Sequence, residues 1–215
     1  MKKTNFLAGI IFGSVVVTAQ GAIPEKPIFR DQIKIALDQQ LPMSQRWTAV
    51  MKTFETASGG VETKQLEQFF AHKDWYIRNA ALIAMERKSV PKAVEAAKKA
   101  VKDRALVVRS AAAEILIKSD QAESVRILID ELNQPYNFRG KQSLWIRSQV
   151  MNYLSTKFDS IERDFFVQLL FDKDSKVAYM AMDALEKKTG EVVDASDVKK
   201  KLGAWQTRAK EKNWL

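Results

Sequence analysis

The sequence predicts an all-α fold, a short solenoid of about four repeated helix pairs with a helical cap at each end. Three observations lead to this prediction: a residue pattern that recurs along the chain, helical spacing of apolar residues within each copy, and turn residues between the apolar segments. The pattern is clearest at residues 103–116. There Val108 precedes Arg109, and small or apolar residues follow the arginine within its next seven positions.

Three further copies of this pattern fix the length of the repeat. They are centred on Arg78, on Arg147 and, with alanine in place of arginine, on Ala178. Together with Arg109 these anchor positions are separated by 31, 38 and 31 residues. The longer interval contains residues 135–141, whose Pro, Asn and Gly favour turns, so this segment is predicted to be an insertion into a period near 31. An apolar segment with a spacing of four precedes each anchor, which makes each copy a helix, a turn and a second helix.

The repeated pattern resembles the HEAT-repeat family of armadillo-type α-solenoids, whose second helix often opens with Asp-x-Asp-x-x-Val-Arg and continues with Ala-Ala and Ala-Leu. The matching residues are Asp74, Ile77 and Arg78 in the first copy, Asp103, Val108 and Arg109 in the second, Ile146 and Arg147 in the third, and Asp172, Asp174 and Val177 in the fourth. The resemblance covers about residues 61–190. It implies a right-handed superhelix whose second helices line a concave face, and it implies a scaffold rather than one particular activity.

The N-terminal segment predicts export. Residues 1–21 combine Lys2 and Lys3, an apolar run and small residues before Ala22, as in a cleaved signal peptide. The alternative is an uncleaved membrane anchor, but the apolar run of about twelve residues is short of the roughly twenty needed to span a bilayer. The mature chain is therefore expected to be periplasmic or secreted and to have no transmembrane segment. The absence of cysteine suits a bacterial envelope protein without disulfides.

The two ends depart from the repeat pattern. Residues 22–60 are predicted to be a proline-containing entry segment and a capping helix pair. Residues 191–215 are predicted to be a basic capping helix that carries Trp205. The whole chain has a formal net charge of +9, and positive charge is concentrated in this last helix.

No pattern in the sequence indicates catalysis, a cofactor or a metal. The chain has a single histidine, His72, in a predicted turn, where a polar turn residue is a better reading than a metal ligand or general base. The zinc pattern His-Glu-x-x-His, a glycine-rich phosphate loop and a nucleophile elbow do not occur. We therefore predict that the chain is not an enzyme and has no catalytic, cofactor-binding or metal-binding residues.

Two rows of equivalent residues suggest a binding face. The arginine anchors either form a ladder with acids of neighbouring turns, the favoured reading, or line a surface that attracts anions. Four residues after each anchor lies an apolar row that is either part of the core or a partly exposed stripe. The candidate binding face consists of Trp75, Arg78, Leu82, Arg109, Trp145, Arg147, Met151 and Met182.

Basic residues of the last helix give a second candidate surface. The candidate anion contacts are Lys199, Lys200, Lys201 and Arg208, although the same residues are also expected on the solvated side of a terminal helix.

The sequence therefore predicts an exported, non-catalytic scaffold that mediates protein–protein interaction in the bacterial cell envelope, with a protein or peptide on the concave face. The alternative is an anionic lipid headgroup or envelope polymer bound at the basic C-terminal end. Nucleic acid is disfavoured as a partner because an export signal would separate the protein from the genome.

Overall fold

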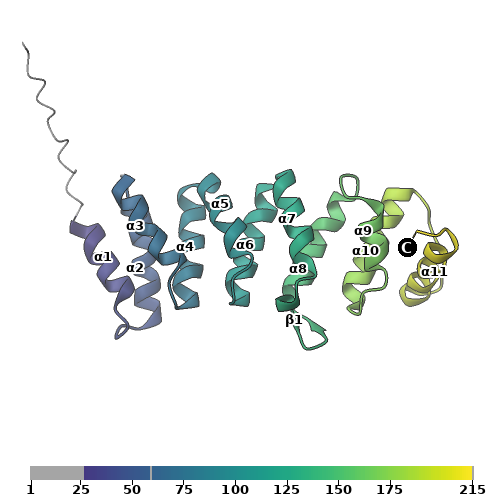
Figure 1. The fold of residues 1–215 in the computed structure, drawn as a ribbon, viewed down its shortest axis with the longest axis horizontal. Coiled ribbons are helices and arrows are strands. Elements are labelled where there is room, and N and C mark those ends of the chain that lie inside the picture. The colour runs from purple at the N-terminus through teal and green to yellow at the C-terminus, as the bar shows by residue number, and fades with distance from the viewer. Residues whose placement is uncertain (1–26, 59, 215) are drawn as a thin grey trace, which may run out of the picture.

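The computed structural model describes residues 27–58 and 60–214 and shows an elongated row of paired helices (Figure 1). The predicted signal peptide lies outside the described residues. The helices are α1 (Pro27–Leu37) and α2 (Met43–Thr56), α3 (Gly60–Phe70) and α4 (Trp75–Lys88), α5 (Val90–Ala100) and α6 (Leu106–Ser119), α7 (Ala122–Leu132) and α8 (Trp145–Leu154), α9 (Arg163–Leu169) and α10 (Ser175–Thr189), and α11 (Val198–Glu211). The predicted all-α solenoid is confirmed.

The second helices of the pairs form the continuous layer of the stack. Helices α2, α4, α6, α8 and α10 each pack against the next one along the row. The first helices lie on this layer, and α5, for example, packs against both α4 and α6. Helices α3, α5 and α7 each contact the second helices of two neighbouring pairs and so help to join them, which is how a solenoid builds one core from repeats that cannot bury their own apolar faces.

Small residues at fixed positions allow the second helices to approach one another closely. Ala80 and Ala81 follow Arg78 by two and three positions, and Ala112 follows Arg109 by three; all three are fully buried. Larger side chains such as Leu116, seven positions after its arginine, fill the space toward the first helices. The sequence pattern that defined the repeat is therefore largely the pattern of the core.

The turns between the two helices of each pair lie along one edge of the row, the lower edge in Figure 1. We call this the turn edge; it comprises residues 38–42, 71–74, 101–105, 133–144 and 170–174 with the first turns of the second helices that follow. The opposite edge carries the connections between pairs.

The predicted insertion forms a small hairpin on the turn edge. A 3₁₀ turn, η1 (Pro135–Asn137), leads into strands β1 (Phe138–Arg139) and β2 (Gln142–Ser143), which pair antiparallel. Gly140 at the tip has a φ of +62°, a left-handed conformation that suits glycine. The hairpin projects beyond the start of α8 at the turn edge (Figure 1).

Both ends of the stack are covered by helices. At the C-terminal end α11 packs on α10 and buries Trp205, whose indole N–H donates to Glu186 at 3.0 Å. At the N-terminal end α1 and α2 form a pair, and α2 packs on α4 as the other second helices pack on one another. By its packing this first pair is a further member of the stack, although its sequence matches the repeat pattern poorly.

Candidate functional site

The arginine anchors are buried and join each pair to the next. The guanidinium of Arg78 makes two bonds to the carboxylate of Asp103, with Nε–Oδ2 at 2.6 Å and Nη2–Oδ1 at 2.7 Å. Its Nη1 donates to the backbone carbonyls of His72 at 2.7 Å and Lys73 at 3.0 Å. One side chain on α4 therefore fastens its own turn and the turn of the following pair, with the bidentate geometry that makes arginine–carboxylate pairs strong.

Arg147 on α8 makes the same kind of arrangement, two helix pairs further along the stack. Its Nη2 lies 2.5 Å from Oδ2 of Asp172, and its Nη1 lies 3.1 Å from Oδ1 of the same residue. It also donates to Ser143, to Asn133 and to the carbonyl of Leu132, and its guanidinium lies 4.4 Å from the ring centroid of Phe138.

Arg109 differs because its partners are neutral. Its Nε donates to Oδ1 of Asn137 at 3.0 Å and its Nη2 to the carbonyl of Tyr136 at 2.6 Å, both in the insertion. Its Nη1 bonds the carbonyls of Asp103 and Arg104 in its own turn. The insertion thus supplies the acceptors that an aspartate supplies elsewhere.

A fourth arginine, missed in the sequence, extends the row to the N-terminus. Arg46 on α2 donates to Asp74 at 3.2 Å, to the hydroxyl of Tyr76 and to the carbonyl of Ala36 at 3.0 Å. Glutamine rather than valine or isoleucine precedes it, which hid it from the pattern, but its distance from Arg78 is close to the repeat length. We call Arg46, Arg78, Arg109 and Arg147 the arginine ladder. At these positions the structure supports the ladder over a surface that attracts anions, because the four residues are buried.

The apolar row is not the partly exposed stripe that we considered for binding. Leu82 and Met151 are 0% exposed and Met182 is 1% exposed. Of the two alternatives, the row is part of the core, because neighbouring second helices pack directly on one another and cover positions that one helix alone would leave open. Trp75 and Trp145, by contrast, are 43% and 54% exposed and stand at the first residues of α4 and α8, on the turn edge.

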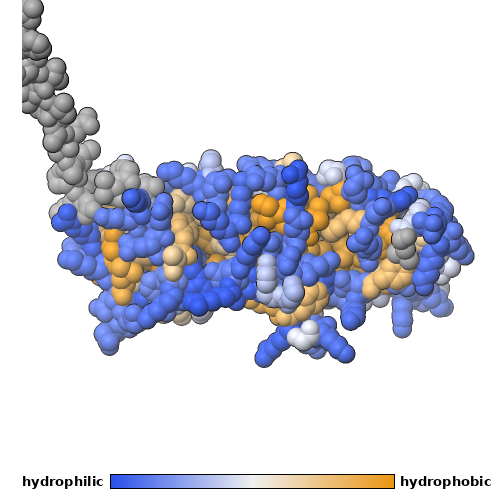
Figure 2. Space-filling view, in the orientation of Figure 1, coloured by the Kyte–Doolittle hydropathy of each residue, from blue (hydrophilic) through white to orange (hydrophobic). Residues whose placement is uncertain are grey.

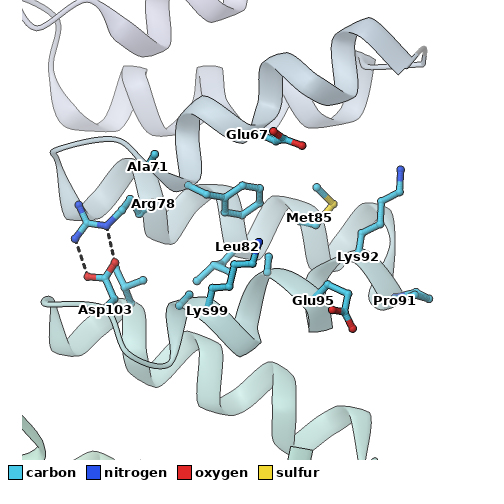
Figure 3. A pocket seen from close by; sticks show the side chains of 14 residues that line it. Glu67, Ala71, Arg78, Leu82, Met85, Pro91, Lys92, Glu95, Lys99 and Asp103 are labelled. Atoms are coloured by element: carbon cyan, nitrogen blue, oxygen red, sulfur yellow. Dashed lines mark hydrogen bonds and ion pairs between the residues drawn. The ribbon is translucent and has the colours of Figure 1, made fainter. Parts of the chain in front are cut away.

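A groove lies between α3 and α5 (Figure 3). Its volume is about 800 Å³, and α4 forms its floor. Apolar residues line it from all three helices, and charged residues of α3 and α5 stand at its rims. The apolar lining comprises Phe70, Ala71, Leu82, Met85, Pro91, Ala96, Ala100 and Val108, and the charged lining comprises Glu67, Lys92, Glu95, Lys99 and the Arg78–Asp103 pair.

Three of the four predicted anion contacts on α11 have carboxylate partners within the chain, although the Lys200–Asp197 pair is long, at 3.8 Å, and exposed. Lys201 pairs with Glu186 at 2.7 Å, and Arg208 pairs with Glu191 at 2.9 Å. Burial alone would raise the pKa of Glu186, but hydrogen bonds from Lys201 and Trp205 outweigh it and lower that pKa. These pairs fasten α11 to the stack, which leaves Lys199 and Lys200 as exposed cations of the predicted set.

His72 is a residue of the α3–α4 turn. Its Nδ1 accepts a hydrogen bond from the backbone N–H of Asp74 at 3.1 Å. Burial is the main cause that lowers its pKa, and nearby cations lower it further despite the carboxylate of Asp74. Its contacts are those of a polar turn residue. Within the described residues there is no group of three or more His, Cys, Asp or Glu side chains that could hold a metal ion.

The comparison with known families bears on this region. A family model described as HEAT repeats matches residues 63–144, the segment from α3 to the end of the insertion. Within residues 63–144 the chain is similar to HEAT repeats. The match includes the groove and the Arg78 and Arg109 rungs of the ladder, and α8 to α10 continue the same packing of second helices. HEAT repeats generally mediate protein–protein interaction, and the fold is typically non-catalytic.

Other comparisons are less informative. A crystal structure of an engineered protein is 14% identical, covers 85% of this chain and 96% of its own, and superposes with a TM-score of 0.45. The search of curated proteins gave no significant match. None of the helices in the described part of the chain is long and apolar enough to cross a membrane.

Replacement of a ladder arginine should destabilise the whole stack. We expect Arg147→Met to lower the free energy of unfolding by about 3–5 kcal/mol, because it leaves the carboxylate of Asp172 without its buried partner. The control is Arg126→Met, an exposed arginine on α7, which should change stability by less than about 0.5 kcal/mol. Urea denaturation followed by circular dichroism measures both. If both variants lowered the free energy of unfolding equally, the ladder would contribute no more to stability than an exposed arginine.

The Arg78–Asp103 rung should respond to acid. Burial would raise the pKa of Asp103, but hydrogen bonds from Arg78 and from the N–H of Ala105 together lower it below the ordinary value of 3.8. A carboxyl with a lowered folded pKa stabilises the fold above its unfolded pKa, and this stabilisation is lost as the pH falls through the folded pKa. The stability difference between the wild type and Asp103→Asn should therefore be full near neutral pH and shrink below pH 3.8. Thermal melts over this pH range test it. A difference that does not depend on pH would contradict the assignment.

A charged side chain placed in the buried apolar row should destabilise the fold. We expect Met151→Glu to destabilise the chain by about 3 kcal/mol or more, because the carboxylate would lie unpaired in the core. Asn152→Glu, at the adjacent exposed position, should be nearly neutral in the same denaturation experiment. If both variants were equally stable, Met151 would be more accessible than the structure shows.

Proposed function

We propose that this protein is an exported, non-catalytic scaffold of the bacterial cell envelope that binds a segment of a partner protein in the groove between α3 and α5. The observation that carries the proposal is the groove itself, an apolar channel of about 800 Å³ within the segment that matches HEAT repeats. The location rests on the predicted signal peptide at residues 1–21, and the type of partner rests on the general use of HEAT repeats.

The shape and chemistry of the groove suit an amphipathic helix. Phe70 of α3 and Ala96 and Ala100 of α5, all partly exposed, offer apolar walls, and α3 and α5 already lie as two helices on α4 with the groove between them (Figure 3). A third helix laid there would bury an apolar face as helices do in other groove-binding complexes. Glu67 on one rim and Lys92 on the other would favour a guest with charges of both signs beside that face.

An anionic ligand at the C-terminal end is less well supported. Lys201 and Arg208 already have carboxylate partners within the chain, so binding there would depend on the exposed Lys199 and Lys200, and Lys200 itself lies 3.8 Å from Asp197. Two exposed lysines on one helix have a sufficient explanation as a solvated surface.

A pull-down with groove variants tests the proposal. Residues 22–215 would be used to capture proteins from the envelope fraction of the source cells at low and at high salt, followed by mass spectrometry. We expect a discrete protein that is retained at both salts, since an apolar interface resists screening. Ala96→Arg, which places a long charged side chain in the groove, should reduce its recovery at least tenfold.

The matched control is Ala111→Arg, a half-buried alanine on α6 outside the groove lining, which should leave recovery unchanged. Circular dichroism would show that both variants remain folded. Loss with Ala111→Arg but not with Ala96→Arg would move the site to the second-helix layer. Retention of lipid or polymer at low salt alone would replace the scaffold hypothesis with binding of an anionic ligand.

A further inference from the structure

Exposed aromatic side chains gather on the turn edge. Among the described residues, every aromatic member of the exposed large hydrophobic group lies there, in a turn or in the first turn of a second helix. Aliphatic members stand at the equivalent places on α2 and α6. The exposed set on this edge is Met43, Trp75, Val107, Tyr136, Trp145 and Phe171.

Exposed cations lie among these side chains. The turns themselves contribute most of them, and the tip of the hairpin, which projects furthest from this edge, has one on each side of Gly140 (Figure 1). Figure 2 shows hydrophilic side chains that extend downward from the molecule at the hairpin. The exposed cations are Lys73, Lys102, Arg104, Arg139, Lys141, Lys173 and Lys176.

Three acids of the same turns point inward: Asp74, Asp103 and Asp172 are each paired with a ladder arginine and are half-buried. Asp174, which is also half-buried, accepts a hydrogen bond from the backbone N–H of Lys176 at the start of α10. In the described chain the exposed carboxylates at this edge are Asp38, in the α1–α2 turn, and Asp130, in the last turn of α7. The arginine ladder thereby neutralises three of the turn acids from within, and the exposed cations of the edge outnumber its exposed carboxylates.

Several of these cations have contacts that do not remove their charge. The ammonium of Lys73 donates to the neutral amide of Gln39 at 3.0 Å, and Arg104 donates to the carbonyl of Lys73 at 2.6 Å. Lys102 lies 3.4 Å from the carboxylate of Glu131, but its own side chain is 64% exposed. All of them can turn toward an anionic surface without breaking the stack.

We propose that the turn edge is a docking surface for an anionic lipid bilayer, with the rod lying along the membrane. Tryptophan and tyrosine partition into the headgroup region, and lysine and arginine next to them contact lipid phosphates. The apolar side chains are spread over successive turns and are not gathered in one pocket. A bilayer accepts separate side chains wherever they fall, whereas a protein partner would need a matching cavity for each.

This surface is independent of the proposed groove. The groove lies between first helices, and none of the exposed apolar and cationic residues of the turn edge lines it, although Ala71 and Asp103 of the same turns do. The chain could therefore bind a protein segment while the edge lies on a membrane, and either property can fail without the other.

Flotation with vesicles tests the proposal. Residues 22–215 contain every described element and omit the N-terminal apolar run, which could bind lipid by itself. We expect this chain to float with vesicles of phosphatidylcholine and phosphatidylglycerol and not with phosphatidylcholine alone. Arg139→Gln with Lys141→Gln should lower partitioning more than tenfold, since each cation near an anionic surface contributes about fivefold. Trp75→Ser with Trp145→Ser should also weaken binding and should abolish the blue shift of tryptophan fluorescence that vesicles cause.

The matched control is Lys199→Gln with Lys200→Gln, which removes the same charge from α11 and should leave binding unchanged. An equal loss in this control would mean that only net charge matters and would overturn the proposal. Absence of flotation with anionic vesicles would do the same. Flotation without a fluorescence shift, displaced by soluble polyglutamate, would show that the edge recognises an acidic polypeptide instead of a bilayer.

Discussion

The stack depends on buried guanidinium groups that reach from one helix pair to the next. Removing a cation from water is expensive, and it is tolerated here because each arginine can direct five N–H donors in one plane at carbonyls of its own turn and acceptors of the next. Lysine, with one charged centre on a flexible stem, could not join two turns in this way. The same interaction orders the turns, closes the spacing between pairs and decides which charges remain outside.

That division of charge connects the interior to the surface. Arg78 pairs with Asp103, and Arg147 pairs with Asp172. Each of these carboxylates would otherwise face solvent and is instead largely buried at the edge of the core. The basic character of the turn edge follows from this, because the turns keep their lysines outside while three of their aspartates pair with the ladder. Elsewhere on the stack, the first helices leave a groove over α4. One fold therefore presents two surfaces of different chemistry.

Much of the architecture could be predicted because the repeat pattern records contacts that lie within or next to each pair. Arg78, Arg109 and Arg147 were found from spacing alone. Arg46 was missed because Gln45 stands where the other copies have valine or isoleucine, even though its guanidinium makes equivalent contacts. The burial of Leu82, Met151 and Met182 was left open for another reason: it depends on how closely a neighbouring helix approaches, which the helical period of one segment does not determine. The groove has the same origin, since it arises from the separation of α3 and α5 on α4.

The neutral acceptors that Arg109 finds in Asn137 and Tyr136 give the pairs a fixed order. A rung needs the correct acceptor from the pair that follows, so α5–α6 fits before a pair that carries the hairpin, and α3–α4 fits before one that offers an aspartate. The repeats are similar in outline yet are not interchangeable units. A gene that duplicated or deleted a single pair would place at least one guanidinium opposite the wrong neighbour, which sets a structural limit on how this array could lengthen or shorten.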